Sequence, residues 1–180
     1  MRDFQDIAFK GQFRDYQQRI LDNAKMHLKD HKIHIVAAPG SGKTILGLEL
    51  IRRLNQPALI LSPSQTVRQQ WGERFKNNFL DDEYLQDYVS YQIKHPQLLT
   101  SITYQAFYSA FQKIETEEDD YTRFDFIKTI QESHIKTICL DEAHHLKSEW
   151  QKALETFLSQ LPNDYTIISL TATPPYDSTS

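Results

Sequence analysis

The sequence has one cysteine, five glycines among 180 residues and no long apolar run. These low counts exclude several classes of protein. The single cysteine, Cys139, excludes an internal disulfide and fits a reducing cytoplasm. The apolar runs fall well short of the roughly 20 residues that cross a membrane. Met1–Asp6 has no apolar stretch behind a basic end. We therefore expect a cytoplasmic protein with neither a membrane span nor a secretory signal.

An excess of positive charge is also missing. The formal net charge is −4 and the sequence pI is about 6.0. A protein that coats nucleic acid through a broad basic surface has the opposite balance. Any contact with nucleic acid must therefore be local, or shared with a further domain.

Short apolar runs alternate with helix-like segments along the chain, and there is room for one domain. We expect strands at 33–38, 58–61, 98–103, 136–140 and 165–170. We expect helices at 13–29, 43–54, 64–79, 105–114, 124–133 and 149–161. This order is typical of an α/β domain with a mainly parallel sheet and helices on both faces. The stretch Glu115–Asp120 carries five acids in six residues, and such a run is typical of a solvated, mobile loop.

Segment 38–44 reads Ala-Pro-Gly-Ser-Gly-Lys-Thr and lies between a predicted strand and a predicted helix. Two glycines let successive backbone N–H groups point at an anion, and the helix N-terminus adds its positive dipole end. Lys43 supplies a cation for the β- and γ-phosphates, and the Thr44 hydroxyl suits Mg²⁺. The strict pattern has Gly where this chain has Ala37, and the alternative is a Gly-rich turn without a ligand. The residues predicted to bind the triphosphate are Pro39, Gly40, Ser41, Gly42, Lys43 and Thr44.

A second motif, Asp141-Glu142, follows the apolar run 138–140. Ligands of parallel α/β sheets bind beyond the carboxyl ends of strands, so this pair can face the phosphate loop. Asp141 would hold Mg²⁺ through water, and Glu142 would orient and deprotonate the attacking water. The alternative is a surface pair that caps the next helix. His144 and His145 follow, but zinc needs three or four ligands, and no cysteine or further histidine spacing supports such a site.

Together these motifs resemble a superfamily-two helicase of the DEAH-box-like kind, and the resemblance runs over nearly the whole chain. Residues 141–144 are the box, and the phosphate loop is that family's first motif. Segment 13–17, Phe-Arg-Asp-Tyr-Gln, resembles the upstream element whose glutamine reads adenine, which assigns this role to Gln17. A carboxamide can donate and accept together on the adenine edge; the alternative is an exposed helix residue. The resemblance implies a RecA-like P-loop NTPase domain over residues 1–180, with ATP and Mg²⁺ as cofactors and His144 as a coupling residue.

Three further segments resemble family motifs that contact the nucleic-acid backbone or couple hydrolysis to strand movement. The predicted backbone contacts are Pro63, Ser64, Gln65, Thr103 and Tyr104. The predicted coupling residues are Thr171 and Thr173. Short hydroxyl side chains and helix N-termini suit phosphate contacts that read no bases. Trp71 follows the first of these segments, and we expect it in the core rather than on a base.

The branch of the family and the partners follow from the same resemblance. His144 stands where the RNA DEAD-box enzymes have Asp, and segment 170–174 resembles the DNA-repair, restriction and remodelling branches, which favours DNA as the track. A second RecA-like domain with the arginines that complete the ATP site is expected in the full-length protein and is absent from this chain. We therefore expect the fragment to hydrolyse ATP very slowly. Two alternatives are an ATP-gated module that switches a protein partner without translocating, and a small-molecule P-loop kinase.

Overall fold

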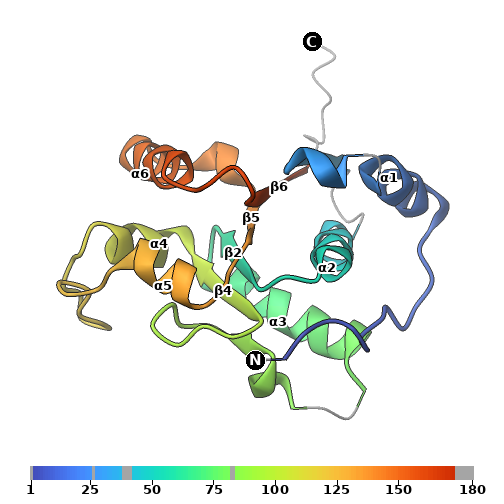
Figure 1. Ribbon diagram of the computed structural model, residues 1–180, viewed down its shortest axis with the longest axis horizontal. Coiled ribbons are helices and arrows are strands. Elements are labelled where there is room, and N and C mark those ends of the chain that lie inside the picture. The colour runs from blue at the N-terminus through green and yellow to red at the C-terminus, as the bar shows by residue number, and fades with distance from the viewer. Residues whose placement is uncertain (1, 26, 38–41, 82–83, 173–180) are drawn as a thin grey trace.

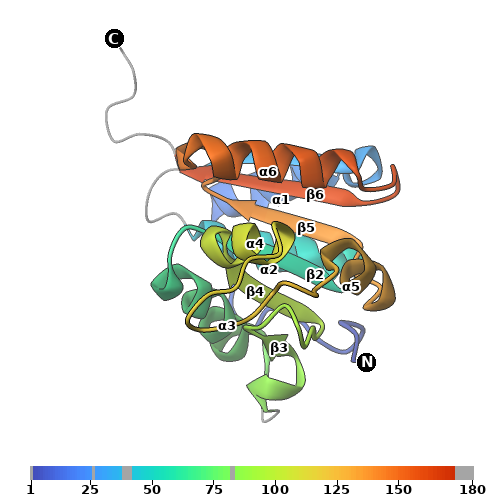
Figure 2. The ribbon, with the colours of Figure 1, turned by 90° about the vertical axis from the view of Figure 1, so that its left-hand side faces the viewer.

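The computed structural model describes residues 2–25, 27–37, 42–81 and 84–172. Within them, six strands form one sheet in the order β1-β6-β5-β2-β4-β3, and every neighbouring pair is parallel. The strands are β1 (Lys32–Ala37), β2 (Ala58–Ser62), β3 (Val89–Ser90), β4 (Leu99–Thr103), β5 (Thr137–Asp141) and β6 (Thr166–Ala172). Figure 2 shows β6, β5, β2 and β4 side by side. The central strands β2, β4 and β5 are buried throughout, as both faces of the sheet are covered.

Helices cover the two faces of the sheet in two groups (Figure 1). On one side lie α1 (Asp15–Lys25), α2 (Lys43–Leu54) and α3 (Gln65–Phe79). On the other side lie α4 (Tyr104–Phe111), α5 (Phe126–Glu132) and α6 (Ser148–Ser159). Short 3₁₀ turns η1 (Leu28–Asp30), η2 (Leu85–Asp87) and η3 (Ala143–His145) complete the order. No helix among these described elements is long and apolar enough to cross a membrane.

The sheet therefore separates two hydrophobic clusters. The cluster under α1, α2 and α3 contains Leu21, Leu46 and Trp71, all essentially without exposed surface. The cluster under α4, α5 and α6 is rich in aromatic rings, with Phe107 and Phe157 at its centre. Burial of this apolar surface on both faces stabilises the domain and fixes the carboxyl ends of the strands at one edge.

Two features differ from the sequence predictions. Strand β3, only two residues long, gave no apolar run to detect and pairs with β4 at the sheet edge. The acidic stretch Glu115–Asp120, predicted as a solvated, mobile loop, is a loop closed by a single antiparallel bridge, which was not predicted, and we call it the acidic hairpin. Glu115 and Asp120 pair as an antiparallel bridge, and Thr116 N–H donates to Asp119 O over 2.7 Å. Its side chains are mostly exposed, as predicted, but its backbone is hydrogen-bonded.

Candidate nucleotide site and nucleic-acid face

The phosphate loop meets α2 at Gly42, which has φ 79°, a conformation that glycine adopts without a steric penalty. Lys43 and Thr44 then form the first turn of α2. A side chain at position 42 would bring its Cβ within 2.6 Å of Gln17 Nε2, so the carboxamide of Gln17 lies directly against this loop. Gln17 is 6% exposed and its Oε1 accepts from Arg14 N–H over 2.9 Å. The alternative of an exposed helix residue is therefore wrong for Gln17.

Lys43 joins the two predicted motifs. Its Nζ lies 2.9 Å from Asp141 Oδ1 and donates a short hydrogen bond to Glu142 Oε1. Burial alone would lower the pKa of Lys43, but its close contacts with the Glu142 and Asp141 carboxylates and their negative charges together raise it. The ammonium and both carboxylates therefore converge on one point at the carboxyl edge of the sheet.

Asp141 ends β5, and its carboxylate and its backbone carbonyl are both held by other side chains. Trp71 Nε1–H donates to Oδ2 over 3.0 Å, and the buried Tyr104 hydroxyl donates to the Asp141 backbone carbonyl over 3.0 Å. Asp141 is 1% exposed. The approach of Lys43 to Oδ1 is an ion pair without the direction of a hydrogen bond, and Oδ1 accepts no hydrogen bond from the described residues. The partner of this buried oxygen is therefore the Lys43 ammonium, and Oδ1 is the atom of Asp141 that would ligate a metal ion when that ammonium moves away.

The donor set at this edge fits a magnesium ion. Mg²⁺ binds oxygen ligands and keeps most of its waters, so one carboxylate, one hydroxyl and the phosphates suffice. Asp141 Oδ1 supplies a buried oxygen that lacks a donor. Thr44 supplies a half-buried hydroxyl on the first turn of α2, directly after Lys43. These two residues are the ones predicted from the sequence to hold the ion.

Glu142 adopts the left-handed conformation, with φ 56° and ψ 42°, which a residue other than glycine rarely does. This turn directs its carboxylate back toward the end of β6, where Oε1 accepts from Ala172 N–H over 2.7 Å. Burial alone would raise the pKa of Glu142, but hydrogen bonds from Lys43 and Ala172, with the charges of Lys43 and His144, lower it. Glu142 is therefore ionised and fixed at neutral pH.

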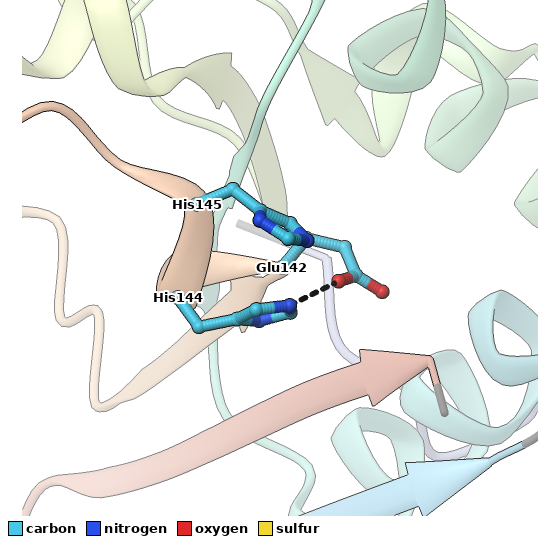
Figure 3. Close-up of side chains that lie close together, drawn as sticks. All are labelled: Glu142, His144 and His145. Carbon is cyan, nitrogen blue, oxygen red and sulfur yellow. Dashed lines mark ion pairs between the residues drawn. The ribbon is translucent and has the colours of Figure 1, made fainter. Parts of the chain in front are cut away.

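The two histidines lie on the same turn as Glu142, as Figure 3 shows. His144 Nε2 is 3.3 Å from Glu142 Oε2, and the His144 and His145 rings are 3.8 Å apart between centroids. One ligand atom from each of the three side chains lies within 4.8 Å of the others. Sequence spacing failed to predict this group because its third member is the carboxylate rather than a cysteine or histidine. Since Glu142 Oε1 already binds Lys43 and Ala172, we assign the group to the nucleotide site as an ion-pair network.

The predicted nucleic-acid residues lie along the same edge but differ in exposure. Pro63, Ser64 and Gln65 are exposed at the start of α3, where Ser64 Oγ accepts from Val67 N–H as the N-cap. Thr103 is nearly buried and caps α4 in the same way. Tyr104 is 1% exposed. The predicted contact through the Tyr104 side chain is therefore corrected: this phenol supports Asp141 from the core.

The remaining predictions divide between described and undescribed parts of the chain. Thr171, half-buried on β6, lies opposite Val36 of β1. The predicted site residues outside the described residues are Pro39, Gly40, Ser41 and Thr173. Trp71 lies in the core as predicted. Its hydrogen bond to Asp141, and the hydrogen bond from Ala172 N–H to Glu142, were not predicted, because they join residues 70 and 30 positions apart in the sequence. No local sequence pattern indicates that an indole will lie beside a carboxylate that is predicted to bind a metal ion.

The parallel sheet, the lysine at the start of α2 and the carboxylate pair after β5 define a P-loop ATPase fold of the RecA-like type. More narrowly, the chain is the N-terminal RecA-like domain of a superfamily-two helicase. It belongs to the family described as type III restriction enzyme, res subunit, whose model matches residues 10–176.

Curated relatives place the same domain in larger proteins. The chain is 28% identical over 171 residues to the DNA 3′-5′ translocase XPB2 of Sulfurisphaera tokodaii, which covers 95% of this chain and 33% of that protein. It is 40% identical over 63 residues to the UvrABC system protein B of Leptospira biflexa, covering 34% of this chain and 10% of that protein. The chain thus spans about a third of the first relative.

Solved structures show the same fold at lower identity. The Pyrococcus furiosus Hef helicase domain superposes with a TM-score of 0.62 at 18% identity, covering 89% of this chain and 33% of that chain. A hypothetical ATP-dependent RNA helicase from Sulfolobus tokodaii superposes with a TM-score of 0.61 at 18% identity, covering 92% and 48%. These two structures show the fold, and the family and the XPB2 relative identify the chain as a helicase- or translocase-like ATPase domain.

Proposed function

We propose that this chain is the ATP-binding motor domain of a nucleic-acid-dependent helicase or translocase that hydrolyses ATP to ADP and phosphate when paired with a second RecA-like domain. The observation that carries the proposal is the convergence of Lys43 with Asp141 and Glu142. A cation, a buried carboxylate and a second, fixed carboxylate form the minimal set for in-line attack of water on a γ-phosphate.

Each residue has one task in this proposal. Lys43 turns from the carboxylates to the β- and γ-phosphates when the triphosphate binds. Asp141 and Thr44 would hold Mg²⁺, which would neutralise developing charge on the phosphates. Glu142 orients the attacking water and accepts its proton. Gln17, which lies against Gly42, hydrogen-bonds the adenine edge.

The nucleic acid is proposed to run along the starts of α3 and α4, past Gln65 and Thr103. Helix N-termini and short polar side chains at this edge suit phosphate contacts. The XPB2 relative is a DNA 3′-5′ translocase, which supports DNA rather than RNA as the track. His144, whose Nε2 lies 3.3 Å from Glu142 Oε2, is proposed to couple hydrolysis to movement together with Thr171 and Thr173.

A second RecA-like domain is proposed to supply the arginines that complete the ATP site. An arginine of this kind contributes on the order of 10³–10⁵ in rate in nucleotide hydrolases. The isolated chain is therefore expected to bind nucleotide and to hydrolyse it far more slowly than the whole protein. Turnover by the isolated chain at the rate of the whole protein would contradict this arrangement.

The test is ATP hydrolysis by the whole protein, measured with and without DNA. Glu142→Gln is expected to retain ATP binding, followed with a fluorescent ATP analogue, and to lower kcat by at least about 100-fold, because the amide cannot accept the proton. Lys43→Ala is expected to abolish tight nucleotide binding itself. Unchanged turnover in Glu142→Gln would remove Glu142 as the base, and hydrolysis indifferent to DNA and RNA would overturn the motor assignment in favour of a nucleotide-gated switch.

A further inference from the structure

Three side chains of the turn that follows β5 bring one metal-ligating atom each to the same place. They are Glu142, His144 and His145, and the three ligand atoms lie within 4.8 Å of one another. Figure 3 shows the two imidazole rings beside the Glu142 carboxylate, each with a ring nitrogen directed to that side. Glu142 is half-buried and both histidines are exposed, so an ion from solvent can reach the group.

The backbone of the turn holds these three residues together. Glu142 has the left-handed conformation, with φ 56°, and η3 begins directly after it. His145 N–H donates to the Glu142 backbone carbonyl over 3.4 Å, which closes a 3₁₀ turn. Side chains three residues apart eclipse each other in such a turn, and this brings His145 over Glu142. The backbone therefore builds the group, although two of its side chains are exposed.

The separation of the ligand atoms suits a zinc ion. Zn²⁺ binds imidazole nitrogen and carboxylate oxygen at about 2.0–2.2 Å in tetrahedral geometry, which places neighbouring ligand atoms about 3.3–3.6 Å apart. His144 Nε2 is 3.3 Å from Glu142 Oε2, so this pair already has the required spacing. His145 lies within 4.8 Å of both, and rotation of its exposed side chain can close the remaining gap. Two imidazoles and one carboxylate leave the fourth position to water.

The two oxygens of the Glu142 carboxylate have different partners. Oε1 accepts from Lys43 and from Ala172 N–H, whereas Oε2 faces His144. The Lys43 ammonium is shared between the carboxylates of Glu142 and Asp141, so the site keeps an excess of negative charge that attracts a cation. A metal ion on Oε2 is therefore compatible with the ion-pair network that Oε1 makes in the nucleotide site.

We propose that Glu142, His144 and His145 form a Zn²⁺ site with three protein ligands and one water, and that the bound ion inhibits ATP hydrolysis; the inhibition rests on the proposed function of Glu142. A carboxylate that binds zinc is a poor acceptor for the proton of the attacking water. Mg²⁺ competes weakly for this group, because it prefers oxygen ligands, whereas imidazole suits zinc. The site would make the motor sensitive to free zinc.

The test of binding is isothermal titration calorimetry of this chain with zinc sulfate, without nucleotide or Mg²⁺. The wild type is expected to bind Zn²⁺ through this group. His145→Ala is expected to weaken that binding at least about 10-fold, because losing only a supporting partner of a metal ligand already costs about that much. The matched control is His95→Ala, which removes an exposed imidazole outside the group. Circular dichroism checks that both variants are folded.

The test of inhibition is DNA-stimulated ATP hydrolysis by the whole protein in excess Mg²⁺ and ATP, with zinc sulfate titrated in. Each variant is compared with its own rate without zinc. The zinc concentration that halves the rate is expected to rise at least about 10-fold in His145→Ala and to keep the wild-type value in His95→Ala.

The outcomes separate the site from the function on which its effect rests. Equal zinc affinity in His145→Ala and the wild type, or no binding in either, would overturn the site. Binding that depends on His145 without inhibition would overturn the inhibition alone. Equal inhibition of all variants would also overturn it, since zinc would then act elsewhere, for example in place of Mg²⁺. Failure of the proposed function is seen separately, as turnover that persists in Glu142→Gln without zinc.

Discussion

At the scale of single residues, Asp141 is a carboxylate, proposed to bind magnesium, that is held by side chains to which the proposed reaction assigns no role. The indole of Trp71 fixes Oδ2, the Tyr104 hydroxyl fixes the backbone carbonyl, and only Oδ1 faces the ammonium of Lys43. Orientation of a metal ligand by surrounding donors is a common requirement for tight binding. Trp71 therefore contributes both to the core and to the site.

Replacing Trp71 by Phe is expected to lower the free energy of unfolding by about 2–3 kcal/mol, because Asp141 Oδ2 loses its donor and the smaller ring leaves a void. Urea denaturation followed by circular dichroism measures this. The matched control is Trp150→Phe, since Trp150 is half-buried and packs against Tyr108 and Lys147. A similar loss in the two variants would show that ring size alone decides the effect.

At the scale of elements, α2 carries the lysine and must lie close to its neighbours. Gly47 allows this approach: a methyl group there would lie 2.7 Å from Trp71 Cη2 and 2.8 Å from Leu170 Cδ1. Both neighbours are fully buried, and Trp71 is further tied to Asp141. The glycine thus sets the spacing between α2, α3 and β6, and with it the position of Lys43.

Gly47→Ala is expected to destabilise the domain by about 1–2 kcal/mol although alanine favours helix. Helix propensity gains about 1 kcal/mol, but overpacking against two immobile groups costs up to about 3 kcal/mol. Thermal unfolding should show a lower midpoint for the variant. A raised midpoint would mean that propensity outweighs the close packing of α2.

The elements also show how far the sequence could predict the fold. An apolar run marked β2 from Ala58 correctly, and the glycine-rich break before Lys43 marked α2 at Lys43–Leu54, because local signals define both. The contact of the acidic hairpin with Lys94 could not be predicted, because Lys94 is distant in the sequence. The proximity of Lys43 to Asp141 and Glu142 could be predicted from their motifs. The hydrogen bonds that hold Asp141 and Glu142 could not, because they join residues far apart in the sequence.

At the scale of the whole molecule, the buried carboxylate of Glu49 helps to connect α2 to the N-terminal segment. Glu49 is 2% exposed and accepts from Arg52 and Arg53, and Arg52 Nη1 also donates to Ile7 O over 3.4 Å. Burial alone would raise the pKa of Glu49. The hydrogen bonds and charges of the two arginines lower this pKa by more than burial raises it, so the net shift is downward. The folded state therefore binds the proton less well than the unfolded chain.

This shift gives a pH dependence of definite sign. The stability from the depressed Glu49 pKa is fully present above the ordinary value of 4.5 and is lost as pH falls through the lower, folded-state pKa. Glu49→Gln is expected to lower the free energy of unfolding by about 2 kcal/mol at pH 7, with a difference that shrinks toward about pH 3. Urea denaturation across this range measures the difference.

The control for acid sensitivity is Glu132→Gln. Glu132 is exposed and lies 3.8 Å from Lys128 in an i,i+4 pair, and such surface pairs contribute little. Its variant should follow the wild type at every pH. A parallel decline of Glu49→Gln and wild type would show that protonation of Glu49 is not what weakens the domain in acid.

The pairing of Lys43 with Glu142 also sets a sequence of events. The Lys43 ammonium lowers the pKa of the Glu142 carboxylate and so weakens it as a proton acceptor. Under the proposed function, a bound triphosphate would attract the ammonium away from Glu142. The pKa of this carboxylate would then rise, and Glu142 would become a stronger base only when a γ-phosphate lies beside it.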